Sequence, residues 1–167
     1  MSFLILTGCV NQNKLSEDQK NVEKEKLKSR IQSFFLAYEN KNMDEIISML
    51  SSSDDFFYFG SDINELGGSK AEFQNQMDMD WKLFDKTKFG EIKNNSIFIS
   101  DDGSFASSIL EIPFNVIISD NPSSFTSRAS LTFTNENGVW RIVQALFSVP
   151  SVGQSSVELV QKKYNKN

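Results

Sequence analysis

The sequence predicts an α+β fold in which a curved antiparallel sheet wraps around N-terminal helices. Two periodicities support it. Apolar residues recur with a helical period in the first half of the chain, whereas side chains alternate with a period of two from residue 86 to residue 148. The length of 167 residues fits one domain, and 39% of the residues are hydrophobic, which is enough for a core.

Three helices are expected before the main sheet. The first begins at residue 27 and carries one apolar stripe with a 3.6-residue period: Leu27, Ile31, Phe34, Phe35 and Tyr38. Asn42 and Glu45 are typical of a helix start and introduce a short second helix. The third begins at a capping box of Ser69 and Glu72, and its apolar face is predicted to hold Phe73, Met77, Trp81 and Phe84.

Strands are predicted from alternation and turn residues. A short strand at 55–59 and a glycine-containing loop at 60–68 precede the third helix, and the later strands cover 87–93, 96–100, 104–118, 125–134 and 139–148. Asn137 and Gly138 supply the turn of the last hairpin. Pro113 lies inside the longest strand and removes a ladder donor, which predicts a bulge or an edge position there.

The composition excludes several classes of function. The chain has no histidine, so nucleophile systems that need an imidazole and His-ligated metal sites are ruled out. Adjacent Asp54 and Asp55 lack the alternating oxygen ligands of a calcium loop, and we predict neither a metal nor a cofactor. The net charge of -5 argues against nucleic-acid binding, because such binding uses clustered Lys and Arg.

The N-terminus resembles a localisation signal. Leu6-Thr7-Gly8-Cys9 resembles the bacterial lipobox, in which the cysteine becomes lipidated, and Cys9 is the one cysteine of the chain. The sequence therefore predicts a truncated-looking lipoprotein signal at 1–9, a polar tether at 10–26, a domain at 27–150 and a polar tail at 151–167. The protein would be anchored by lipid to a membrane of the cell envelope. The alternative is an apolar N-terminus on a cytoplasmic protein.

Three segments together carry a family resemblance. They are the loop Gly60-Ser61-Asp62-x-x-Glu65-x-x-Gly68, the strand 138–143 (GVWRIV) and the ending 147–150 (FSVP). Residues 27–150 resemble the SnoaL-like branch of the nuclear transport factor 2-like superfamily. The resemblance implies a cystatin-like cone fold with an internal pocket. It also implies one of two roles: a polyketide cyclase-like or ketosteroid isomerase-like enzyme with a pocket carboxylate as base, or a module that only binds.

Four polar residues are candidates for the pocket. Glu111 lies among apolar strand residues, where it would act as a general base or pair with Arg128 or Arg141. Gln144 stands where the last strand of related sequences often has a histidine, and it either lines the pocket or is a buried amide with backbone partners. Asp62 and Glu65 of the glycine-containing loop would border the cavity mouth, with Asp62 as a base. Alternatively, both are solvated and Asp62 stabilises a local turn.

Aromatic residues are expected to complete the ligand site. Phe57, Tyr58 and Trp81 would form an apolar wall, Tyr58 would offer a hydroxyl, and Trp81 would alternatively pack in the core. We expect a module that binds a small apolar or amphipathic ligand, or a protein partner, without catalysis. A homodimer through the open sheet face is a further expectation.

Overall fold

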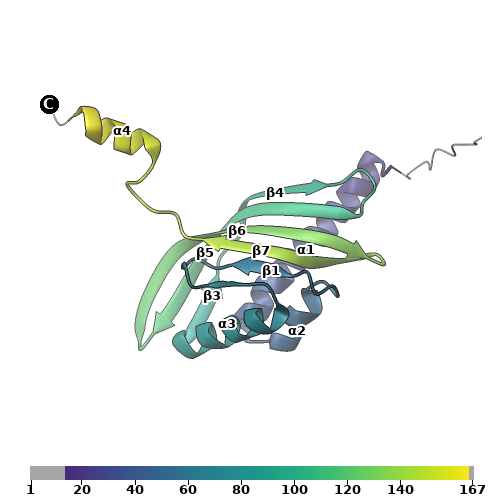
Figure 1. Ribbon diagram of the computed structural model, residues 1–167, viewed down its shortest axis with the longest axis horizontal. Helices are drawn as coiled ribbons and strands as arrows, with labels where there is room; N and C mark the ends of the chain where they lie inside the picture. Colours follow the sequence, from purple (N-terminus) through teal and green to yellow (C-terminus); the bar gives the residue numbers. More distant parts are fainter. Residues whose placement is uncertain (1–13, 166–167) are drawn as a thin grey trace, which may run out of the picture.

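The predicted α+β fold with a curved sheet is confirmed by a computed structural model, which describes residues 14–165 (Figure 1). Its four helices are α1 (Glu17–Glu39), α2 (Met43–Met49), α3 (Lys70–Leu83) and α4 (Ser156–Tyr164). Its strands are β1 (Phe57–Phe59), β2 (Leu66–Gly67), β3 (Lys86–Phe89), β4 (Lys93–Ile99), β5 (Phe105–Ile118), β6 (Asn121–Glu136) and β7 (Val139–Ser148).

The strands form one sheet in the order β2-β1-β7-β6-β5-β3, and β4 also pairs with β5. The long β5–β6 and β6–β7 hairpins make the centre of the sheet, as the alternation predicted. The pair β1–β7 is parallel, so the sheet is not wholly antiparallel. In Figure 1, α1 runs behind the sheet and α3 lies below β1.

The core lies between α1 and the inner face of the sheet. On β5 the buried residues alternate strictly, and they are Ala106, Ser108, Leu110, Ile112, Phe114 and Val116. The apolar stripe of α1 is buried against this face, as its spacing predicted. Burial on one face of a strand and one stripe of a helix explains why the two elements pack together.

Pro113 lies at a local edge of the sheet, which is one of the two positions that the sequence offered, because β3 and β4 leave a gap beside it. β4 pairs with β5 as far as Glu111, and β3 pairs with it from Phe114 onward. Pro113 therefore faces the break between β3 and β4, where its missing N–H costs no ladder hydrogen bond. Its carbonyl still accepts a hydrogen bond of 2.8 Å from the backbone N–H of Gly90.

Residues 17–26 were expected to belong to a polar tether, and this prediction is wrong because α1 begins at Glu17. Ser16 and Gln19 form a capping box at its start. The Trp140 indole N–H donates a 2.8 Å hydrogen bond to Glu23, which ties this part of α1 to the sheet. Cys9, which the sequence predicts to be lipidated, lies outside the described residues.

The segment predicted as a polar tail, 151–167, contains α4. A capping box of Ser155 and Glu158 begins this helix, none of whose described residues is buried, and Figure 1 shows it apart from the sheet. Across residues 14–165, no helix combines the length and the apolar character that a membrane span requires.

Candidate functional site

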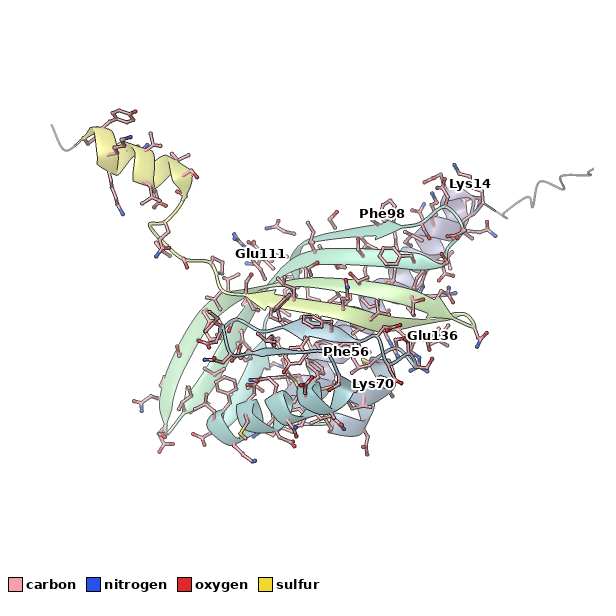
Figure 2. All side chains as sticks on the ribbon, viewed as in Figure 1. Lys14, Phe56, Lys70, Phe98, Glu111 and Glu136 are labelled. Carbon is pink, nitrogen blue, oxygen red and sulfur yellow. The ribbon has the colours of Figure 1, made fainter. Side chains whose placement is uncertain are left out.

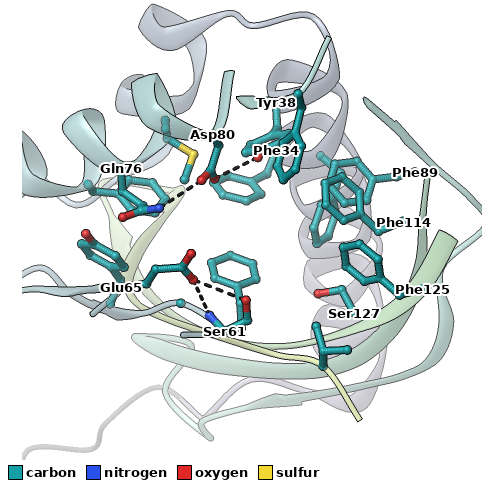
Figure 3. A pocket seen from close by; sticks show the side chains of 18 residues that line it. Phe34, Tyr38, Ser61, Glu65, Gln76, Asp80, Phe89, Phe114, Phe125 and Ser127 are labelled. Atoms are coloured by element: carbon teal, nitrogen blue, oxygen red, sulfur yellow. Dashed lines mark hydrogen bonds between the residues drawn. The ribbon is translucent and has the colours of Figure 1, made fainter. Parts of the chain in front are cut away.

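A cavity of about 140 Å³ lies between the helices and the concave face of the sheet (Figure 3). Ten of its 18 lining residues are aromatic: Phe34, Phe35, Tyr38, Tyr58, Phe73, Phe84, Phe89, Phe114, Phe125 and Phe147. A cavity of about 150 Å³ with apolar walls accommodates a molecule the size of benzene. The size and the lining therefore suit one small ring.

One wall of the cavity is a row of three phenylalanines. The strand register pairs Phe89 of β3 with Phe114 of β5, and Phe114 with Phe125 of β6. The Phe89 and Phe114 rings stack with centroids 4.6 Å apart, and Phe125 meets Phe114 edge-on at 4.9 Å. Pairing across neighbouring strands thus places the rings side by side on the inner face.

The polar end of the cavity is built around Asp80 on α3. Its carboxylate accepts a 2.9 Å hydrogen bond from the Tyr38 hydroxyl of α1 and a 3.0 Å hydrogen bond from the Gln76 amide one turn earlier. Burial raises the pKa of Asp80, the two hydrogen bonds oppose this rise, and the charge of Glu65 adds to it. Burial and the adjacent Asp80 raise the pKa of Tyr38, so this hydroxyl stays protonated and donates.

A second carboxylate, Glu65, reaches the cavity from the loop between β1 and β2. It accepts hydrogen bonds from the backbone N–H groups of Ser61 at 2.7 Å and Asp62 at 3.1 Å, which fix its position. A Cβ at Gly60 would overlap the Glu65 side chain, so the loop requires glycine there. Figure 3 shows Glu65 and Asp80 on the side of the cavity opposite Phe114.

Of the three aromatic residues predicted to bind the ligand, Tyr58 is the one that lines this cavity. Its pKa is raised by burial and by the nearby carboxylates of Glu72, Asp80 and Glu65. Phe57, next to it on β1, points to the opposite face of the sheet and is 39% exposed. Trp81 packs against the core beside Tyr38 and does not line the cavity.

Asp62 does not line the cavity either. Its carboxylate accepts a 3.0 Å hydrogen bond from the backbone N–H of Asn64, which is the local turn that the sequence offered as the alternative.

Glu111 lies on the outer face of the sheet, so its placement in the pocket is corrected. Its carboxylate accepts hydrogen bonds from Arg128 at 2.8 Å and from Asn94 at 2.7 Å, and these bonds hold its pKa below the usual range. The predicted pairing with Arg128 is thus confirmed. Glu111 borders an open depression on the outer face, and Figure 2 shows it on the side of the sheet away from α3.

Gln144 is also on the outer face, because β7 has an irregularity that the sequence pattern did not reveal. Thr132 pairs with Gln144 but the next residue, Phe133, pairs with Ile142, so Val143 is an extra residue. The extra residue reverses the alternation. Ala145 is buried where Gln144 was expected, and Gln144 is exposed.

Sequence reasoning missed Asp80, Gln76 and Tyr38 as site residues, whereas Glu65 lines the cavity as expected. Asp80 follows Phe73 by seven positions and Met77 by three, which places a carboxylate within the apolar stripe of α3. A carboxylate in an apolar helix stripe is the sequence feature that could have identified Asp80. Across residues 14–165, no group of three His, Cys, Asp or Glu side chains is placed to hold a metal ion.

Comparison with protein families matches residues 27–151 to the SnoaL-like domain. Comparison with curated protein sequences gives no match.

Many solved structures share the fold. A nuclear transport factor 2-like protein from Salmonella enterica serovar Typhimurium has a TM-score of 0.71 and 17% identity, covering 81% of this chain and 99% of its own. A cystatin-like protein from Caulobacter vibrioides has a TM-score of 0.66 and 12% identity, covering 83% and 97%. A type 2 hexachlorocyclohexane dehydrochlorinase has a TM-score of 0.64 and 10% identity, covering 78% and 90%. Such identities establish the fold alone.

Proposed function

The chain belongs to the SnoaL-like domain family, and we propose that its domain binds one small, largely apolar molecule in the aromatic cavity without transforming it. The observation that carries this proposal is the cavity itself, with aromatic walls and a few polar groups that converge at one end around Asp80. Ligand sites in proteins share this composition, in which apolar walls give affinity and the polar groups fix orientation.

The hydrogen bonds of Asp80 favour binding over catalysis. Both of its oxygens already accept a hydrogen bond, from Tyr38 and from Gln76. These bonds stabilise the charged carboxylate and lower its pKa, which makes Asp80 a weaker base, and its remaining lone pairs are free to accept from a ligand. The chain has no histidine to pass a proton onward.

A neutral probe tests the proposal. We expect benzyl alcohol to bind the full chain, measured by calorimetry and by NMR shifts of the cavity aromatic rings. Ser127 lines the cavity, so Ser127→Phe should fill it and abolish binding, whereas Thr126→Phe, at the exposed neighbouring position, should leave binding unchanged. Equal binding by both variants would contradict the proposal, as would the absence of binding by benzyl alcohol and by its charged analogues benzylamine and benzoate.

A second candidate function is proton abstraction by Asp80. Its raised pKa and its place at the cavity are the observations that favour it, and Tyr38 would stabilise the developing negative charge. The structurally similar dehydrochlorinase shows that this fold supports an enzyme. If Asp80 is a base, the protein should accelerate deuterium exchange at the acidic carbon of small cyclic ketones in D₂O, and Asp80→Asn should abolish it. If exchange proceeds only at the rate seen in buffer, Asp80 does not act as a base and ligand binding is the one candidate function that stands.

We also propose that a lipid at Cys9 anchors the protein in the cell envelope, on the support of the Leu6-Thr7-Gly8-Cys9 motif. Mass spectrometry of the protein from its native host should find an acylated N-terminus at Cys9. An intact Met1 would refute the anchor and favour the cytoplasm. The homodimer through the sheet stays a prediction, which light scattering would test.

A further inference from the structure

The two charged side chains that line the cavity are both acidic. They are Asp80 and Glu65, and neither Lys nor Arg is among the lining residues of the described chain. The charge of Glu65 contributes to the raised pKa of Asp80, so the two carboxylates repel each other across the same space. A cation bound between them would relieve this repulsion, whereas an anion would increase it.

The opposite wall suits the apolar part of such a ligand. Phe89, Phe114 and Phe125 face the carboxylates across the cavity (Figure 3). Ligand pockets bind apolar groups through aromatic walls of this kind, while a few polar groups fix the orientation. The net charge of -5 would in addition raise the local concentration of cations around the protein.

We propose that the ligand is a small organic cation, a protonated amine on a single ring or a short apolar body. The ammonium lies between Asp80 and Glu65, and the apolar body lies against the Phe89 and Phe114 rings. An ammonium offers three donors, which can serve the two lone pairs that Tyr38 and Gln76 leave free on Asp80 and one lone pair of Glu65. This inference rests on the proposed function, because it names the ligand class of the same cavity.

Three probes of similar size and different charge test the proposal at pH 7. They are benzylamine, which is a cation, benzyl alcohol, which is neutral, and benzoate, which is an anion. We expect the full chain to bind benzylamine at least tenfold more tightly than benzyl alcohol, and benzoate more weakly than either. Calorimetric titration gives the three dissociation constants.

Variants locate the preference. Asp80→Asn keeps the shape of the side chain and removes its charge, so it should remove most of the tenfold preference for benzylamine while benzyl alcohol still binds. Glu65→Gln should reduce the preference as well. Asp78→Asn is the matched control, because Asp78 is exposed on the same helix and does not line the cavity. It should leave all three affinities unchanged.

The outcomes separate the two proposals. If benzyl alcohol or benzoate binds as tightly as benzylamine, the cation proposal is overturned and ligand binding in the cavity stands. A preference for benzylamine that persists in Asp80→Asn and Glu65→Gln also overturns it, since the cation then binds elsewhere. If none of the probes binds, the proposed function fails, and the cation proposal fails with it.

Discussion

The hydrogen bond from Tyr38 to Asp80 joins α1 to α3 at the cavity, and its removal should destabilise the domain. Tyr38 is 7% exposed, and its hydroxyl lies 2.9 Å from the Asp80 carboxylate. Tyr38→Phe removes this hydroxyl and keeps the ring contacts with Phe89 and Phe114. A hydrogen bond to a charged group contributes about 1.5–3 kcal/mol. We expect the free energy of unfolding to fall by that amount at pH 7, measured by urea denaturation followed by circular dichroism.

The cost of Tyr38→Phe should depend on pH in a defined direction. Burial raises the pKa of Asp80 in the folded state, so the contribution of Asp80 to stability is present at low pH and is lost as the pH rises through that pKa. The hydrogen bond from Tyr38 opposes the rise, and its loss raises the pKa further. The cost is therefore largest where Asp80 is ionised, and it falls towards the 0.5–1.5 kcal/mol or so of a neutral hydrogen bond in acid.

Tyr164→Phe is the matched control, because Tyr164 is exposed on α4 and its hydroxyl should contribute less than about 0.5 kcal/mol. Two results would refute the reasoning about Tyr38. One is a cost at pH 7 no larger than that of Tyr164→Phe. The other is a cost that grows as the pH falls.

Two further predictions concern the core and the docking of α1. Phe114→Ala should lower the free energy of unfolding by about 3–5 kcal/mol in urea denaturation, because Phe114 is buried in the aromatic wall. Phe98→Ala changes an exposed position and should lower it far less. Similar losses of stability in the two variants would contradict this prediction. Glu23→Ala removes the acceptor of the Trp140 indole N–H, so it should lower the free energy of unfolding by about 1.5–3 kcal/mol and shift the tryptophan fluorescence. Glu25→Ala, at an exposed position on the same helix, should change neither quantity. If Glu23→Ala leaves stability and fluorescence unchanged, α1 is not held to the sheet by this hydrogen bond.

The sequence predicted the fold because its periodic segments are long. In β5, fourteen residues alternate, and the apolar set from Ala106 to Val116 can face only one side of the sheet. The stripe on α1 is equally unambiguous from Leu27 to Tyr38. A polar sequence gave no such signal for the first turns of α1, since Glu23 meets its partner Trp140 across 117 positions of the chain. A local pattern cannot contain that contact.

The site was predicted poorly because it depends on details finer than a period. One extra residue, Val143, moves Gln144 from the concave face to the outer face. Neither a turn residue nor a break in the alternation of the sequence indicates this extra residue. Glu111 shares its strand with the cavity wall, but its face is the one opposite Phe114. A single polar residue in a strand therefore indicates a pocket only when it is known which face of the sheet its side chain lies on.

Asp80 shows which sequence feature does predict a site residue. An ionisable side chain in the apolar stripe of a helix must find hydrogen-bond donors once the stripe is buried, because an unpaired buried charge costs several kcal/mol or more. Tyr38 is the member of the α1 stripe that has a hydroxyl, and Gln76 is the donor one turn away on α3. The polar members of two apolar stripes that pack on one core are thus expected to meet. In this domain they do meet, at 2.9 Å, and the cavity opens beside them.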